Sequence, residues 1–401
     1  MKPAPNSRSL ILIFSVGFFI VLATYFISLI ARGYRFSLKD GFSLEPTGMI
    51  SAVSRPKGAS VYLDDKLITA TDDTISLSPG VYQLKITKDG FLPWQKTVTV
   101  KPETVYQADI QLFSTVPNLK PVTLTGAINP AVNLDNTKIV YAVASASAAK
   151  DNGLYLIESA GLPLSLIRSD SRQIAVNTAT IDWSDFSFTF SPNSRQILAT
   201  NSLEKINYLL PLDTPISPQT LVDITHNLDT IHLDWQTQTT AILAAKLQSL
   251  PKDIQPFVAT DSAQNLQFSS DDNKILYLAQ TDGNIKANLI TPPPARSTQT
   301  EHRQLLADNY YVYDLKDDTN FLIGPKNEVL YPSWIPNTNN LTFVNQDNLK
   351  VVDYDGTNRQ VIFASNFNHR LVIPWTGGDK IIILTTPYPG APENLYSISV
   401  K

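Results

Sequence analysis

The sequence predicts one N-terminal transmembrane helix followed by an all-β region that holds a small β-sandwich and a β-propeller of about six blades. Three observations support this fold class. Residues 9–31 form an apolar run, residues 49–113 alternate apolar and polar side chains, and a turn-centred unit recurs from residue 132 onward. The 401 residues are 43% hydrophobic, which suffices for two or three domains with apolar cores. We expect five segments: a short cytoplasmic tail (1–8), the transmembrane helix (9–31), a juxtamembrane linker (32–48), the sandwich (49–115) and the propeller (120–401).

The composition excludes several classes of function. There are 36 acidic and 32 basic residues, for a net charge of -4, so we expect no nucleic-acid partner. Only 17% of the residues are charged, below the roughly 25% of an average soluble domain. Neutral polar residues fill this deficit, which suits a surface outside the cytoplasm. The chain has no cysteine, which rules out disulfides, thiolate metal sites and thiol nucleophiles.

Residues 9–31 contain no charged side chain. As a helix they span roughly 34 Å, enough for the hydrocarbon core of a bilayer. A cleavable signal peptide is the alternative, but its apolar core normally holds about 7 to 15 residues. No convincing small-x-small cleavage site precedes Arg32 either. We therefore expect an uncleaved, single-pass anchor, with the membrane as partner.

The charges that flank this helix do not decide its orientation. Lys2 and Arg8 on one side face Arg32, Arg35 and Lys39 on the other. The long, weakly charged β-rich chain that follows can be translocated regardless of flanking charge. We therefore expect a protein of the cell membrane with most of its chain extracytoplasmic.

Residues 49–113 have the period-two pattern of antiparallel strands. Tyr82, Leu84 and Ile86 alternate with polar residues, and glycine, proline or aspartate marks each predicted turn. A sheet with one apolar, buried face and one polar, solvent-exposed face is typical of a compact β-sandwich. The segments PKGASVYLD (56–64), LSPGVYQLKI (77–86) and KDGF (88–91) resemble a PEGA domain.

The resemblance departs from the family pattern in two places. Lys57 occupies the acidic position of the family motif, and the usual Gly-x-Thr-Pro is missing between Leu67 and Asp73. Neither departure touches the turn glycines or the alternating core. The resemblance implies a small module of bacterial surface proteins, often beside a membrane anchor, and no enzymatic activity.

The recurring unit in the rest of the chain is an apolar residue, six residues that hold a polar turn, and the start of an apolar strand. Its copies are 190–197, 235–242, 268–275, 334–341, 375–382 and a weaker 132–139. Successive copies begin 33 to 66 residues apart, around the roughly 40 to 50 residues of a four-stranded propeller blade. We count six blades. A seventh fits if residues 315–322 belong to another blade.

Two of these copies carry a second resemblance. FSPN at 190–193 and FSSD at 268–271 resemble the degenerate Phe-Ser-Pro-Asp-Gly repeat of TolB-like and WD-repeat-like propellers. Only 26 residues follow Trp375, fewer than a blade needs. We therefore expect the segment 121–128 to complete the last blade and close the ring.

Candidate chemistry is sparse. The four histidines, His226, His232, His302 and His369, have no strong ligand spacing, and no nucleophile elbow, Walker-type loop or dinucleotide fingerprint is found. We expect no cofactor and no enzymatic activity. The alternative is an envelope hydrolase or lyase whose carboxylates come from several blades and meet in the propeller channel.

Asp353, Asp355 and Asn358 are the candidate metal ligands, because their oxygens suit a hard cation such as calcium. The competing interpretation is a hairpin turn, which we favour because the distal bidentate glutamate of a calcium loop is missing. The segment 282–284 (DGN) is a weaker turn of the same kind.

Tyr310, Tyr311 and Tyr313 are candidate binding residues, because aromatic side chains near a loop can form a contact patch. The alternative is that they are packed strand residues. The proline-rich insertion 291–296 just before them is either a solvated linker or a docking segment.

Taken together, the sequence indicates an envelope interaction protein that displays a propeller for recognition of protein or cell-wall glycan.

Overall fold

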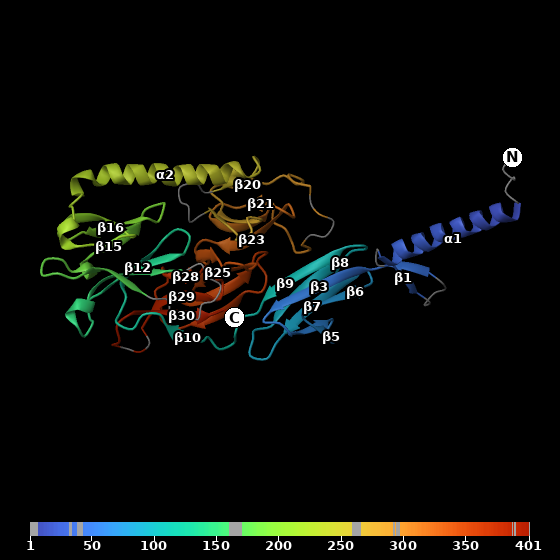
Figure 1. Cartoon of the computed structure of the whole chain (residues 1–401), viewed down its shortest axis with the longest axis horizontal. Coiled ribbons are helices and arrows are strands. Elements are labelled where there is room, and N and C mark those ends of the chain that lie inside the picture. Colours follow the sequence, from blue (N-terminus) through green and yellow to red (C-terminus); the bar gives the residue numbers. More distant parts are fainter. Residues whose placement is uncertain are drawn as a thin grey trace, which may run out of the picture. The chain divides into compact units, whose positions relative to one another are not determined.

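The computed structural model (Figure 1) describes residues 7–31, 34–37, 43–159, 171–258, 266–291, 293, 297–386, 388 and 390–400. The chain divides into two compact units. The N-terminal unit comprises Met1–Thr87, Gln95–Ile110 and Pro293–Gln299. The blade unit comprises Lys88–Trp94, Gln111–Pro292 and Thr300–Lys401.

The predicted apolar helix is present as α1, Ser7–Ala31. Its segment Leu12–Ile30 has a mean hydropathy of 2.4, and none of it is buried against the rest of the chain. By length and composition this helix can cross a membrane, and an N-terminal signal sequence has the same properties.

The N-terminal unit contains a two-stranded hairpin and two further sheets, ordered β6-β3-β9 and β5-β4-β7-β8. Its strands are β1 (Tyr34–Ser37), β2 (Ser43–Pro46), β3 (Gly48–Arg55), β4 (Ser60–Leu63), β5 (Lys66–Ala70), β6 (Asp73–Leu77), β7 (Gly80–Thr87), β8 (Trp94–Val100) and β9 (Val105–Gln111). Side chains alternate as the sequence predicts, with Val61, Leu84, Ile86 and Val98 fully buried. These apolar faces form the core of the predicted sandwich.

The blade unit contains five sheets of three or four strands among the described residues, and each has the size and meander order of a propeller blade. Blade 1 consists of β11 (Ile128–Val132), β12 (Lys138–Val143), β13 (Gly153–Glu158) and β14 (Arg172–Val176), and blade 2 consists of β15 (Ser187–Phe190), β16 (Gln196–Asn201) and β17 (Ile206–Pro211). Blade 3 consists of β18 (Leu266–Phe268), β19 (Lys274–Leu278), β22 (Asn309–Asp314) and β23 (Thr319–Pro325). Blade 4 consists of β24 (Leu330–Trp334), β25 (Asn340–Asn345), β26 (Asn348–Asp353) and β27 (Gln360–Ala364).

Blade 5 closes the structure by joining the two ends of the unit. Its order is β10-β30-β29-β28, with β10 (Leu119–Pro121), β28 (Val372–Pro374), β29 (Lys380–Thr385) and β30 (Asn394–Ser399). Leu119 pairs with Ile398 and Pro121 with Tyr396. The predicted closure by the chain that precedes blade 1 is therefore confirmed, although the closing strand lies slightly earlier than 121–128.

Four apolar cores lie between neighbouring blades. They join blades 1 and 2, 3 and 4, 4 and 5, and 5 and 1. Fully buried members are Ile197 in the first, Leu341 in the second, Ile381 in the third and Ile139 in the last. Each blade thus depends on its neighbours to bury its faces, as a radial repeat requires.

The recurring sequence unit is the first hairpin of a blade. The two apolar ends of a copy are cross-strand partners in Phe190 with Ile197, Phe268 with Ile275, Trp334 with Leu341 and Val132 with Ile139. In the fifth copy the pairing is displaced by one residue, to Pro374 with Ile381. Each of the five turns contains one residue with left-handed backbone: Asn136, Ser194, Asp272, Asn337 and Gly378.

The remaining copy, 235–242, is not a hairpin. It lies inside α2, Leu228–Gln248, so the described residues form five blades where the sequence suggested six. Two apolar residues seven apart lie on one face of a helix, so the pattern fits either structure. The intervening residues 236–241 contain no glycine, proline, asparagine or aspartate, and they therefore favour the helix.

Helix α2 and the chain after it cover the face of blade 3 that has no neighbouring sheet in the described part of the chain. Leu243, Leu250 and Ile254 pack in one cluster with Tyr277 and Tyr311 of that blade. In Figure 1, α2 runs from the side of β16 to the side of β20. Where the sequence predicted a sixth blade between blades 2 and 3, the chain therefore forms a helix that packs on blade 3.

The long interval between the copies that begin at 268 and 334 contains no seventh blade among its described residues either. Residues 315–322 hold the turn between β22 and β23, and a hairpin inserted after β19 accounts for the extra length. Its strands are β20 (Gly283–Asn284) and β21 (Gln304–Leu305). Short 3-10 helices complete the unit: η1 (Ala149–Asp151), η2 (Trp183–Asp185), η3 (Pro218–Thr220), η4 (Thr225–Asn227) and η5 (Gln255–Phe257).

Two leucines of α2 test this role of the helix. Leu243 is 5% exposed and Leu233 is 65% exposed. Leu243→Ala should lower the free energy of unfolding by about 2–3 kcal/mol because it leaves a cavity against blade 3. Leu233→Ala should change it by less than about 0.5 kcal/mol. Urea unfolding of the two variants measures the difference, and equal effects would contradict the packing of α2 on blade 3.

The first turn of blade 3 contains an exposed carboxylate with strong local partners. Asp271 accepts hydrogen bonds from Ser269 Oγ at 2.6 Å and from Asn273 Nδ2 at 2.8 Å. Partial burial by itself raises the pKa of Asp271, but these hydrogen bonds and nearby Lys274 outweigh it and lower the pKa from 3.8 to about 2. The ionised carboxylate therefore stabilises the fold.

This stabilisation should depend on pH. A lowered pKa adds stability above the ordinary value, and that stability disappears as the pH falls toward the folded value. Asp271→Asn should cost about 1 kcal/mol at pH 7, after allowance for solvent screening. The difference from wild type should fade between about pH 4 and pH 2. Chemical unfolding of wild type and variant across this pH range measures the difference, and Asp272→Asn is the control that should leave stability unchanged. A stability loss of Asp271→Asn that persists at pH 2 would rule out an electrostatic origin.

Candidate functional site

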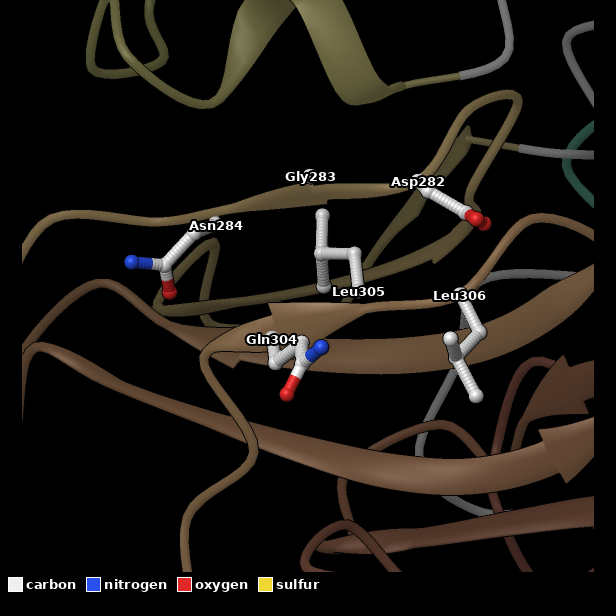
Figure 2. A pocket seen from close by; sticks show the side chains of 6 residues that line it. All are labelled: Asp282, Gly283, Asn284, Gln304, Leu305 and Leu306. Carbon is white, nitrogen blue, oxygen red and sulfur yellow. The ribbon is translucent and has the colours of Figure 1, made fainter.

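A hollow of about 590 Å³ lies beside the β20–β21 hairpin of the blade unit. Its lining residues are Asp282, Gly283, Asn284, Gln304, Leu305 and Leu306 (Figure 2). The volume is within the range of roughly 300–1,000 Å³ that is common for small-ligand sites. We take this hollow as the candidate functional site.

The hairpin has one anchored face and one open face. Asn284 pairs with Gln304, and Gly283 pairs with Leu305. Leu305 is 1% exposed and belongs to the apolar core beneath blade 3 and α2. In Figure 2, the side chains of Gln304 and Leu306 point to the opposite side from Leu305. The period-two alternation of the strand thus places Gln304 and Leu306 on the open face, opposite the buried Leu305.

The open face offers neutral hydrogen-bonding groups. The side-chain amides of Asn284 and Gln304 are exposed and form no hydrogen bond within the described part of the chain. Each amide can donate through its NH₂ group and accept through its oxygen. Asp282 Oδ1 accepts a hydrogen bond from Ala307 N at 2.7 Å. Leu306, 53% exposed, adds an apolar surface.

Gly283 is required by close packing. A Cβ atom at this position would lie 2.0 Å from Cε1 of Phe257. Any side chain here would displace the phenyl ring or the strand, because a ring in this position has little freedom to move. The glycine lets the hairpin lie directly on the segment that follows α2.

A buried ion pair fixes the same hairpin to blade 3. Arg303 Nη2 lies 3.1 Å from Asp318 Oδ2 and also donates to the carbonyl of Asp318. Arg303 Nη1 donates to the carbonyl of Lys286 at 2.7 Å, which ties the incoming strand to the outgoing one. Asp318 is fully buried, and its carboxylate also accepts from Tyr313 Oη at 2.5 Å and from Asn288 N at 2.8 Å. Every charge in this pair is therefore compensated.

Burial and the neighbouring carboxylate both affect Tyr313. Loss of solvent is the larger cause, and the hydrogen bond to Asp318 with its negative charge acts in the same direction, so the pKa of Tyr313 is raised. The pKa of Asp314 is also raised, because burial outweighs the attraction of Lys274 at 3.7 Å. Tyr313 therefore stays protonated and serves as a hydrogen-bond donor to Asp318.

The predicted metal ligands lie elsewhere, in the turn between β26 and β27. Asp353 is 6% exposed, and its Oδ1 accepts from Asn340 Nδ2 at 2.8 Å. Its Oδ2 accepts from Trp94 Nε1 at 2.8 Å and from Asn358 Nδ2 at 3.0 Å. The structure thus brings Asp353 and Asn358 together, with Asn358 as the hydrogen-bond donor and Asp353 as the acceptor.

Asp355 is 7% exposed and accepts from Thr357 Oγ1 at 2.6 Å within the same turn. No group of three or more histidine, aspartate or glutamate side chains in the described residues is arranged to hold a metal ion. The three candidate ligands thus take part in hydrogen bonds in and around the β26–β27 turn.

The predicted binding tyrosines lie inside β22. Tyr310, Tyr311 and Tyr313 are 9%, 1% and 0% exposed. The packed-strand alternative therefore describes their positions. Two of them form hydrogen bonds that support the candidate site. Tyr311 Oη accepts from Leu306 N at 2.9 Å, and Tyr313 Oη donates to the carboxylate of Asp318.

Most of the proline-rich insertion 291–296 lies outside the described residues. The chain just after it belongs to the N-terminal unit, where Thr298 Oγ1 accepts from Thr99 N at 3.3 Å. Gln299 Nε2 donates to the carbonyl of Thr97 at 2.6 Å. These side chains bond to backbone groups of β8, which is the last strand of its sheet.

The comparisons with known proteins concern the two folds separately. Residues 47–115 match the family model of the PEGA domain. This match covers the segment that carries the sandwich pattern and confirms the first resemblance. No curated protein matches the chain.

Three of the similar solved structures have low identity to this chain. TolB from Acinetobacter baumannii is 11% identical with a TM-score of 0.17, over 75% of this chain and 62% of TolB. An oligogalacturonate lyase from Vibrio parahaemolyticus is 9% identical with a TM-score of 0.21, over 89% and 90% of the two chains. An acylaminoacyl peptidase from Pyrococcus horikoshii is 9% identical with a TM-score of 0.19, over 67% and 36%. The description of the sheets as blades therefore rests on their strand order and on the closure of blade 5.

The buried ion pair gives a testable prediction for the site. Arg303→Met should lower the free energy of unfolding by about 3 kcal/mol, because the carboxylate of Asp318 stays buried without its cation. The double variant Arg303→Met with Asp318→Asn should regain at least half of this loss, as measured by urea unfolding.

A matched control is available nearby. Lys286 Nζ and Asp253 Oδ1 form a 3.0 Å ion pair in which the lysine side chain is 77% exposed. Lys286→Met should change stability by less than about 0.5 kcal/mol. If both single variants cost the same, the Arg303–Asp318 pair does not anchor the hairpin.

Proposed function

We propose that this chain is a membrane-anchored binding protein of the bacterial cell envelope, with most of its residues outside the cytoplasm, that recognises protein or cell-wall glycan through the blade unit. The observation that carries the proposal is the hollow beside the β20–β21 hairpin, an open site with unpaired side-chain amides on a rigid support. Binding residues on an inserted loop held by a stable scaffold are a common arrangement in propellers and other β folds.

Three further features support the location in the envelope. Helix α1 has an apolar surface that no other part of the chain buries, which suits insertion in lipid. The PEGA match at 47–115 begins 16 residues after the end of α1, and the family resemblance implies a surface module. The low share of charged residues also agrees with this location.

The electrostatics favour binding without turnover. Asp314, a carboxylate whose raised pKa would suit a general acid, is buried beside Lys274 and does not line the hollow. Asp282 is the only acidic residue among the six lining residues. A glycoside hydrolase normally uses two carboxylates in its active site. We therefore place the hydrolase or lyase alternative second.

Protease accessibility tests the location. Protease added to intact cells, with the outer membrane permeabilised where there is one, should degrade the blade unit, detected with an antibody against the C-terminal residues. A cytoplasmic protein in the same cells should stay intact. Survival of the C-terminal region until the membrane is lysed would overturn the proposed orientation, and a purified chain that has lost α1 would overturn the anchor.

A further inference from the structure

The positive charges around the hollow are already paired within the protein. Arg303, the residue before the hairpin strand, pairs with Asp318 and lies 3.1 Å from Glu301. Lys286, two residues after β20, pairs with Asp253 at 3.0 Å. The six lining residues include no cation. An anionic ligand would therefore find no unpaired positive partner here, and it would also meet the carboxylate of Asp282.

The remaining groups of the hollow suit a neutral polyhydroxyl ligand. The amides of Asn284 and Gln304 come from paired positions on adjacent strands, so they lie next to each other on one face. Together they present donors and acceptors side by side, and Asp282 adds a carboxylate acceptor. A sugar with neighbouring hydroxyl groups offers both donors and acceptors at this spacing, and its C–H face can lie on Leu306.

A protein partner is less well matched to the same surface. Energetically dominant contacts in protein interfaces come mainly from tryptophan, tyrosine and arginine. None of the six lining residues is aromatic, and the nearby arginine is occupied by Asp318. A hollow of about 590 Å³ is also closer to the size of a short oligosaccharide than to that of a folded protein surface.

We infer that the hollow beside the β20–β21 hairpin binds a neutral oligosaccharide through Asn284, Gln304 and Asp282. This inference rests on the proposed binding function and narrows it to one ligand class at one site. Because no aromatic ring lines the hollow, we expect weak binding, with a Kd of about 0.1–10 mM for a single site.

The test uses the full chain in detergent micelles. The probes are three neutral trisaccharides (cellotriose, chitotriose and maltotriose), with trigalacturonate as the anionic comparison and an uncharged hexapeptide as the peptide comparison. Binding is measured by saturation-transfer NMR and calorimetry. We expect at least one neutral trisaccharide to bind and trigalacturonate to bind at least about tenfold more weakly.

Variants locate the site. Asn284→Ala and Gln304→Ala should each raise the Kd about fivefold or more, because each removes hydrogen bonds to the sugar. Gln236→Ala, an exposed amide on α2, is the matched control and should leave the Kd unchanged. Gly283→Ala should also weaken binding, because it displaces the hairpin from Phe257. Equal thermal midpoints for the three amide variants show that the fold is kept.

The outcomes separate the inference from the proposed function. Binding of a neutral trisaccharide that is insensitive to both amide variants overturns the site and leaves the binding function standing. Tighter binding of trigalacturonate or of the hexapeptide overturns the ligand class. No trisaccharide binding up to about 50 mM overturns the inference, and a failure of the topology experiment independently overturns the proposed function.

Discussion

The stability of the blade unit depends on one constraint, which is that the apolar faces of its sheets must be buried against neighbouring elements. Four apolar cores between neighbouring sheets meet this requirement directly. The remaining face of blade 3 is buried by Leu243 of α2 and by Leu250 and Ile254 after it. The helix thus fills a structural need that a further sheet would otherwise meet.

The candidate site is a consequence of this substitution. The segment that covers blade 3 also provides Phe257, on which Gly283 of the inserted hairpin lies. Leu305 reaches into the same apolar core from the other strand. The hairpin is thereby held against the covering segment on one face, and its polar face is left to form the hollow.

Buried polar groups add precision to this apolar support. The carboxylate of Asp318 forms an ion pair with Arg303 and accepts hydrogen bonds from Tyr313 and from the backbone of Asn288. These three partners come from different segments of the chain. Because an unpaired buried charge is costly, these segments are constrained to one relative arrangement. A second polar cluster, around Asp353, fixes Trp94 and Asn358 in the same manner. The Asp353 cluster was visible in the sequence only as an acidic turn, and no spacing in the sequence indicated the Asp318 cluster.

The sequence by itself determined the apolar helix, the sandwich pattern and the blade hairpins, since these depend on local periodicity and turn residues. The copies 190–197 and 268–275 are examples: the spacing predicted a turn in each, and the structure shows that their apolar ends are cross-strand partners. The apolar spacing alone left 235–242 open between hairpin and helix, and only the tertiary structure decided that the tyrosines of β22 are buried and that Asn284 lies beside Gln304 at the hollow. The physical reason is that a seven-residue spacing fits both a hairpin and a helix, and that exposure depends on which distant segment covers each face.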